Sequence, residues 1–203
     1  MTNLREIKTG TAMKIVLASG SPRRQKLLSE MGYDFEVVTP VIPEKNTPGE
    51  APQDFVKRLS RLKAESVALK YPDSLIVGAD TVVVLERRIL GKPESKSEAK
   101  SMLELLSGKT HTVFTGLSMI VLEKDITTSD FDSTEVTFNK LSPEDINRYV
   151  ESGEPLDKAG AYGIQGMGSF LVDNYDGELD TVIGFPSKLF KTMYEGVLSC
   201  PEL

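Results

Sequence analysis

The chain has 203 residues and a formal net charge of −6, with one histidine (His111), one cysteine (Cys200) and no tryptophan. These counts exclude an intramolecular disulfide framework, a cysteine-rich zinc site and a site with two histidine ligands. The negative charge argues against a general nucleic-acid binder, which needs a basic surface. Catalysis would therefore depend on carboxylates, lysine, arginine and backbone groups, and any metal would be a hard cation held by oxygens.

The sequence carries no signal for membrane insertion or for secretion. No run of about 18 apolar residues is present, so no membrane-spanning segment and no membrane partner are expected. The first twelve residues are polar and lack the apolar stretch of a signal peptide. We expect a disordered tail over 1–13, a single domain over 14–203 and a cytoplasmic location, with a nuclear one left open.

Strand and helix patterns alternate along the first half of the chain. Ser21-Pro22 is typical of a helix start, and Gly32 of a helix end. The clearest helix is amphipathic, with an apolar stripe predicted at Phe55, Leu59, Leu62, Ser66 and Leu69. The predicted elements are a strand at 14–19, a helix at 22–31, a strand at 35–38, a loop at 40–49, a helix at 52–71, and a strand at 75–77 that reaches a turn at 78–81 and continues extended over 82–85.

The second half is dominated by longer strands that alternate and are rich in threonine and valine. They are expected to be antiparallel neighbours, so the whole chain is predicted to be a mixed α/β fold with a mixed sheet. The predicted elements are a turn at 86–88, a strand at 89–90, a helix at 95–106 closed by Gly108, strands at 110–122 and 132–138, a helix starting at 142–145, an irregular glycine-rich segment at 157–168, a strand at 170–174 and a helix at 186–198.

The segment SGSPRR at 19–24 is the first candidate for chemistry. A strand leads through a glycine turn into a helix N-terminus, where backbone N–H groups favour phosphate. Ser19, Ser21, Arg23 and Arg24 add donors that fit phosphate oxygens. The alternative is a capped helix with two surface arginines, and these residues alone leave the two interpretations equally open.

Carboxylates supply the second candidate. Asp80 follows a run of apolar residues, where a charged side chain is unexpected unless it has a function. Such an aspartate can hold Mg²⁺ or activate water. A turn-forming aspartate that bonds its own backbone is the simpler alternative. Glu44 by itself ranks no higher than a solvated loop residue.

Two lysines and one glutamine complete the candidates. Lys63 lies beside the apolar stripe of its helix, where a solvated lysine is the simpler interpretation. Pro93 restricts Lys92 to an extended backbone that can aim its ammonium at a phosphate, and a plain turn is an equally good interpretation. Gln165 lies in a segment with four glycines, and its amide can match the N3–H donor and O4 acceptor of uracil or thymine. A structural glycine loop with an exposed glutamine stays open, and the single His111 is interpreted as structural.

Together, these motifs resemble the Maf family of nucleoside triphosphate pyrophosphatases, which share an architecture with the inosine triphosphate pyrophosphatases. The resemblance extends from about Lys14 to Leu198 and implies an α/β fold with a mixed, strongly twisted sheet flanked by helices, and an active-site cleft between two lobes. It is carried by LASGSPRR (17–24), Glu44, RLKAES (61–66), GADTVV (78–83), GKP (91–93), LSGKTHTV (106–113) and DKAGAYGIQG (157–166).

The resemblance implies hydrolysis between the α- and β-phosphates, which gives a nucleoside monophosphate and pyrophosphate. It implies that Asp80 accepts a proton from water, and that Glu44 and Asp80 hold a divalent cation (Mg²⁺, Mn²⁺ or Co²⁺). It further implies a homodimer, a nucleoside triphosphate as the partner and no stable nucleic-acid partner. The implied phosphate-binding residues are Ser19, Ser21, Arg24, Lys63 and Lys92.

The implied substrate follows from the branch of the family. One branch prefers dTTP, UTP and modified uridine triphosphates, and another prefers 7-methyl-GTP and carries Trp, Gln and Glu at the places of Arg23, Thr81 and Gln165. This chain resembles the first branch, and its lack of tryptophan removes the best aromatic face for a cationic guanine. It departs from the family at Pro43, where a second acidic residue is frequent, and in its N-terminal extension. A regulatory nucleotide-binding protein linked to cell division arrest and a 7-methyl-GTP pyrophosphatase remain as alternatives.

Overall fold

The computed structural model describes residues 13–43 and 49–200. Glu44 and all but the last residue of the expected N-terminal tail therefore lie outside the described residues. Within the described ranges, none of the helices has the length and apolar character needed to cross a membrane.

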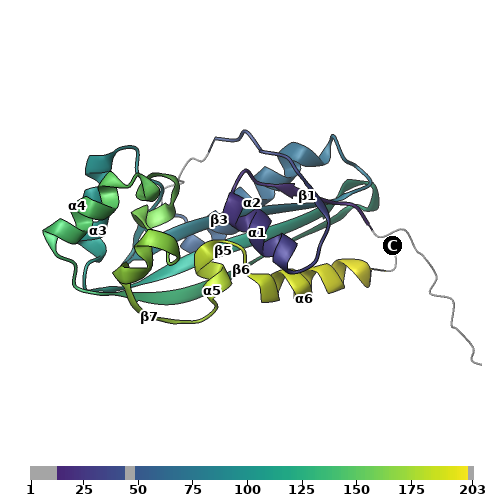
Figure 1. Ribbon diagram of the computed structural model, residues 1–203. Helices are drawn as coiled ribbons and strands as arrows, with labels where there is room; N and C mark the ends of the chain where they lie inside the picture. The colour runs from purple at the N-terminus through teal and green to yellow at the C-terminus, as the bar shows by residue number, and fades with distance from the viewer. Residues whose placement is uncertain (1–12, 44–48, 201–203) are drawn as a thin grey trace, which may run out of the picture.

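A twisted seven-stranded sheet forms the centre of the molecule (Figure 1). Its order is β2–β1–β3–β5–β6–β7, with β4 also beside β3. β1 is parallel to both β2 and β3, and every other pairing is antiparallel. The strands are β1 (Ile15–Ala18), β2 (Phe35–Val37), β3 (Leu75–Leu85), β4 (Arg88–Leu90), β5 (Thr110–Val121), β6 (Ile126–Phe138) and β7 (Val172–Asp176).

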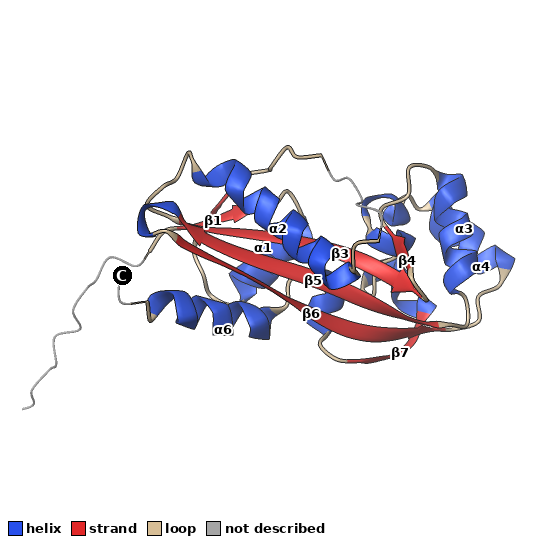
Figure 2. Ribbon diagram, turned by 180° about the vertical axis from the view of Figure 1, so that it is seen from behind, coloured by secondary structure: helices blue, strands red, loops and turns tan. Residues whose placement is uncertain are grey.

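Helices cover both faces of this sheet. The helix α2 lies across β3 and β5 on one face (Figure 2), whereas α1, α5 and α6 pack on the opposite face, and α3 and α4 gather at one end. The helices are α1 (Pro22–Glu30), α2 (Pro52–Ala68), α3 (Lys96–Leu106), α4 (Pro143–Glu151), α5 (Leu179–Ile183) and α6 (Ser187–Leu198), with short 3₁₀ segments at η1 (Leu122–Lys124), η2 (Glu154–Asp157), η3 (Ala159–Ala161) and η4 (Gly166–Leu171).

Two glycines allow α2 to approach the sheet unusually closely. A Cβ on Gly78 would lie 2.1 Å from the carbonyl oxygen of Ser60, and one on Gly116 would lie 2.4 Å from that of Val56. Gly116 pairs with Asp80 across β3 and β5, and Gly78 lies two residues before Asp80, so all three share the face that α2 covers. The close approach therefore places α2 directly over Asp80.

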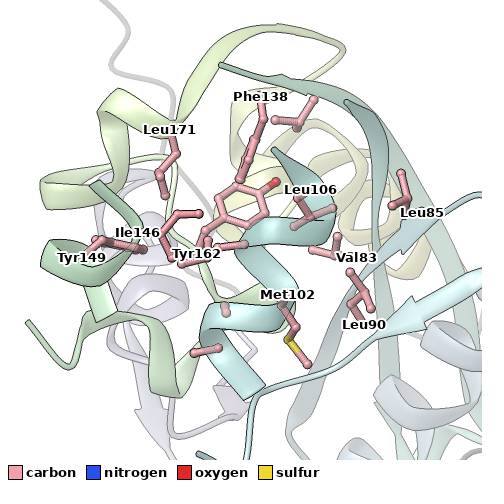
Figure 3. Packing of buried hydrophobic residues seen from close by; sticks show 14 of the residues in the cluster. Val83, Leu85, Leu90, Met102, Leu106, Phe138, Ile146, Tyr149, Tyr162 and Leu171 are labelled. Atoms are coloured by element: carbon pink, nitrogen blue, oxygen red, sulfur yellow. The ribbon is translucent and has the colours of Figure 1, made fainter. Parts of the chain in front are cut away.

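The opposite face carries two separate hydrophobic clusters. One lies under α1 and α6 and includes Leu17, Val77 and Phe190. The other fills the space between the sheet and α3 and α4, where Figure 3 shows Val83 and Tyr162 among its side chains. Because Val77 and Val83 lie on the same face of β3 six residues apart, the clusters form two lobes along one strand, as the expected architecture requires.

Most predicted elements are confirmed within a few residues, including the hairpin from β3 to β4 and the long antiparallel pair. The predicted turn at Gly78–Thr81 is wrong, because β3 runs unbroken from Leu75 to Leu85 and pairs with β5 through those residues. β6 begins at Ile126 rather than at residue 132, because it pairs with β5 along nearly its whole length. The short helix α5 was not predicted.

The predicted apolar stripe of α2 is also wrong in part. Leu62, Ser66 and Leu69 are exposed, while Ser60 and Lys63 are buried. The buried face is rotated because the close contact at Gly78 admits only small side chains and backbone, and Ser60 and Ala64 fill that position.

Candidate active site

A gap in the edge of the sheet defines the candidate site. On one edge of β3, β1 pairs with Leu75–Gly78 and β4 pairs with Val83–Leu85. Residues 79–82 therefore have no strand beside them on that edge within the part of the chain that the structure describes. A cavity of about 720 Å³ opens at this gap, at the carboxyl end of β1, which is where α/β sheets bind ligands.

An ion pair lies at the base of the cavity. Lys63 Nζ donates to Asp80 Oδ1 at 2.5 Å, and the two side chains are only 10% and 7% exposed. The interpretation of Lys63 as a solvated lysine is therefore wrong, because α2 turns it toward the sheet. A positive charge this close favours the ionised carboxylate, which is the form that can accept a proton.

The N-terminus of α1 forms a second wall. Ser21 is the N-cap and Pro22 the first helical residue, as predicted, although the Ser21 side chain makes no capping hydrogen bond. Ser19, Ser21 and Arg23 line the cavity, and the Ser19 hydroxyl accepts the Ser21 N–H at 3.2 Å. A helix start that opens onto a cavity offers partial positive charge to an anion there.

Arg24 joins three parts of the chain. Its guanidinium donates to the Gly184 carbonyl at 2.8 Å, to the Ser19 hydroxyl at 3.1 Å and to the Thr81 hydroxyl at 3.1 Å. Gly184 ends α5 with a positive φ of 110°, and a Cβ there would lie 3.0 Å from the Thr81 hydroxyl. Arg24 therefore lines the cavity and also fixes α1 against β3 and α5.

The Thr81 hydroxyl both donates and accepts a hydrogen bond within the protein. Thr115 Oγ1 donates its single proton to the Thr181 carbonyl at 2.8 Å, so the 3.0 Å contact between Thr81 and Thr115 requires Thr81 to donate. The Thr81 oxygen in turn accepts from Arg24. Thr81 therefore links Arg24 of α1 to Thr115 of β5.

The remaining candidates lie around the mouth of the cavity. Lys92 follows β4 and is exposed, and Gln165 is exposed at the start of η4. Arg23 reaches across to Asp157, with 2.8 Å between its Nη1 and a carboxylate oxygen. Burial acts to raise the pKa of Asp157, but hydrogen bonds from Lys158 and Arg23 outweigh it and hold the pKa below its ordinary value.

The structure thus brings together nearly all of the predicted set around one cavity. Glu44 lies outside the described residues. Sequence reasoning did not single out Thr115, Asp157, Lys158 or Gly184. The strongest signal for Asp157 and Lys158 was their position at the start of the glycine-rich segment at 157–168. The predicted residues that line the cavity are Ser19, Ser21, Arg23, Arg24, Lys63, Asp80, Thr81, Lys92 and Gln165.

The donor set allows a test of whether a cation fits. No group of three metal-binding side chains exists among the described residues. Asp80 lines the cavity beside the positively charged wall. Mg²⁺ is commonly held by one or two carboxylates together with substrate phosphates and water. Glu94 and Asp157 also line the cavity, but no three such side chains are grouped in the described part of the chain. The site therefore fits a cation held by Asp80 together with phosphates and does not fit an all-protein metal cage.

The single histidine lies behind the cavity wall. His111 is buried on β5, and its Nε2 is 2.7 Å from the hydroxyl of Tyr162, which lines the cavity. Burial lowers the pKa of His111 from 6.5 to about 4, so the ring is neutral at pH 7. Its position is consistent with the structural interpretation.

Comparison with known proteins supports the same assignment of the fold and of the family. A solved structure of the Staphylococcus aureus Ham1 protein has the same fold, with a TM-score of 0.51 and 14% identity, and the match covers 91% of this chain and 99% of that one. Proteins from Bacillus anthracis and Bacillus cereus, both named dTTP/UTP pyrophosphatase, are 50% identical over 173 residues, which is 85% of this chain and 90% of theirs. The model of the family described as "Maf-like protein" matches residues 14–197. With the motifs in order around one cavity, the chain belongs to the Maf-like protein family.

Proposed function

We propose that this protein is a dTTP/UTP pyrophosphatase that hydrolyses the bond between the α- and β-phosphates and releases a nucleoside monophosphate and pyrophosphate. The observation that carries the proposal is the buried Lys63–Asp80 pair at the base of a cavity whose walls are cationic. The names of relatives at 50% identity support it. Modified uridine triphosphates are included as substrates, and the role is to keep unwanted nucleotides out of nucleic acids.

Asp80 is the proposed proton acceptor. Its carboxylate lies in the strand β3, which is paired with β5 on one side and open to the cavity on the other. Lys63 fixes the orientation of that carboxylate and favours its ionised form. A water molecule between Asp80 and the triphosphate would lose its proton to Asp80 as it attacks phosphorus.

The cationic wall is proposed to hold the triphosphate. The start of α1, with Ser19, Ser21 and Arg24, faces one side of the cavity, and Lys63 and Lys92 line it elsewhere. Phosphate-transfer catalysis consists mainly of positioning and charge stabilisation, so fixed donors of this kind supply the required chemistry. The bracing of Arg24 by three neighbours makes it a rigid donor.

A divalent cation is proposed as the cofactor, held by Asp80 and Glu44 together with the phosphates. When bound, it supplies charge neutralisation and polarises the phosphate oxygens. Base selection is assigned to Arg23, Thr81 and Gln165, with the Gln165 amide pairing with the N3–H and O4 of uracil or thymine. We further propose a homodimer in the cytoplasm.

Product analysis tests this function. The purified protein, with Mg²⁺ or Mn²⁺, is incubated with dTTP, UTP, CTP, GTP and 7-methyl-GTP, and pyrophosphate and orthophosphate are measured separately. Pyrophosphate released in preference from dTTP and UTP supports the proposal. Orthophosphate alone, inert protein, or faster turnover of 7-methyl-GTP would contradict it, and the last result would assign the chain to the other branch.

A further inference from the structure

One ion pair crosses the mouth of the cavity. Arg23 lies in the first turn of α1, and Asp157 ends η2, so the two belong to segments 134 residues apart in the sequence. Arg23 Nη1 donates to Asp157 Oδ2 at 2.8 Å, and its Nη2 donates to the Asp157 carbonyl at 3.4 Å. The same residue therefore accepts both hydrogen bonds, which fixes the plane of the guanidinium.

The other carboxylate oxygen of Asp157 accepts a hydrogen bond from Lys158. Lys158 Nζ donates to Asp157 Oδ1 at 2.7 Å and to the Glu154 carbonyl at 2.6 Å. The Lys158 side chain is only 12% exposed, although it ends in a charge. The two oxygens of one carboxylate thus connect Arg23 of α1 with Lys158 of the opposite wall.

The stem of Lys158 supports the backbone of the glycine-rich segment. A Cβ on Gly163 would lie 2.9 Å from Lys158 Cε, so the lysine stem packs directly against the backbone at Gly163. From the other side, the Gly163 N–H donates to the hydroxyl of Tyr149 at 3.0 Å. Tyr149 belongs to the cluster shown in Figure 3, which makes it a fixed support. These contacts hold the backbone at Gly163, which lies two residues before Gln165.

We propose that Asp157 and Lys158 are positioning residues for nucleotide selection, because they connect Arg23 to the segment that carries Gln165. The inference rests on the proposed function, in which Arg23 and Gln165 select the base. These two residues come from opposite walls, so their separation depends on what lies between them. The Arg23–Asp157–Lys158–Gly163 chain of contacts fills that place.

A purely structural role of the Arg23–Asp157 pair predicts a different effect on substrate choice. The Arg23 and Asp157 side chains are 32% and 60% exposed, and exposed ion pairs contribute little to stability. Loss of the pair should therefore leave the melting temperature nearly unchanged. If the pair only stabilised the fold, substrate choice would also stay unchanged, whereas a positioning role changes substrate choice without unfolding the protein.

The test compares UTP with CTP, which differ in the atoms at positions 3 and 4 of the base. We measure kcat and KM for both nucleotides in the wild type, Asp157→Asn and Lys158→Met. The ratio of kcat/KM for UTP over CTP is expected to fall about tenfold in each variant, mainly through KM for UTP, since displacement by part of an ångström weakens a directed contact. Glu151→Gln, which loses the exposed ion pair between Glu151 of α4 and Lys96 of α3, is the matched control and should keep the ratio.

A double substitution tests the connection itself. If Asp157 acts through Arg23, adding Asp157→Asn to Arg23→Ala should change the ratio no further. An unchanged ratio in both single variants, or fully additive effects in the double variant, would overturn the inference while the proposed function stands. A wild type that releases no pyrophosphate from UTP would overturn both.

Discussion

Substitution of Gly78 by alanine should disturb stability and activity together. The new Cβ would lie 2.1 Å from the Ser60 carbonyl oxygen and 2.9 Å from the Ala64 nitrogen, where ordinary contacts begin at 3.4 Å. Because both obstructing atoms are backbone, α2 must move away from β3 by about 1 Å. Overpacking of this kind costs about 1–3 kcal/mol, and rigid backbone places this site near the upper value.

The same movement should carry Lys63 away from Asp80. A displacement of about 1 Å at reacting groups can lower the rate about 100-fold. We therefore expect Gly78→Ala to lose about 3 kcal/mol in urea unfolding followed by circular dichroism. The expected fall in pyrophosphate release from UTP is about 100-fold per folded molecule.

Gly196→Ala in α6 is the matched control for Gly78→Ala. Nothing lies within 4 Å of a Cβ at Gly196, so alanine should stabilise the helix by about 0.5–1 kcal/mol and leave activity unchanged. Wild-type stability and activity in Gly78→Ala would refute the reasoning that the glycine sets the distance between α2 and β3.

Two further predictions concern stability. The pKa of His111 is lowered to about 4, so the unfolded chain binds more protons than the folded one between about pH 6.5 and 4. The free energy of unfolding should therefore fall by up to about 3 kcal/mol as the pH drops through that range. Urea midpoints at pH 7, 6 and 5 should fall less steeply in His111→Gln than in the wild type, and an equal pH dependence in both would contradict this. The Ser142 hydroxyl accepts a hydrogen bond from the Asp145 N–H at 3.1 Å at the start of α4. Ser142→Ala should lower the free energy of unfolding by about 1 kcal/mol and leave pyrophosphate release unchanged. A loss of activity would show that α4 does more than support the lobe.

The sequence predicts those features of the fold that depend on local chemistry. Ser21-Pro22 begins α1 and Ser142-Pro143 begins α4, because proline and an N-cap residue act within one turn. The alternation of threonine and valine identifies β5, because period two is a property of a single strand.

Other features depend on neighbours that the local sequence does not reveal. Asp80 does not end its strand; it faces a cavity because β1 and β4 stop on either side of it. Lys63 is buried because two glycines bring α2 close to the sheet, so a stripe chosen by leucine content is rotated from the true one. Arg24 and Thr81 were expected to face substrate only, yet both also hold the fold together.

Turnover by Asp80→Asn tests the central claim most directly. The asparagine keeps the size of the side chain and an oxygen that can accept from Lys63, but it cannot accept a proton from water. Activity is measured with UTP and Mg²⁺ per folded molecule, and binding of a UTP analogue with a non-hydrolysable α,β bridge is measured beside it. Asp173→Asn, an exposed substitution on β7, serves as the control. The account predicts retained binding and a kcat lower by about 100- to 10,000-fold; turnover within about threefold of the wild type would contradict the role of Asp80.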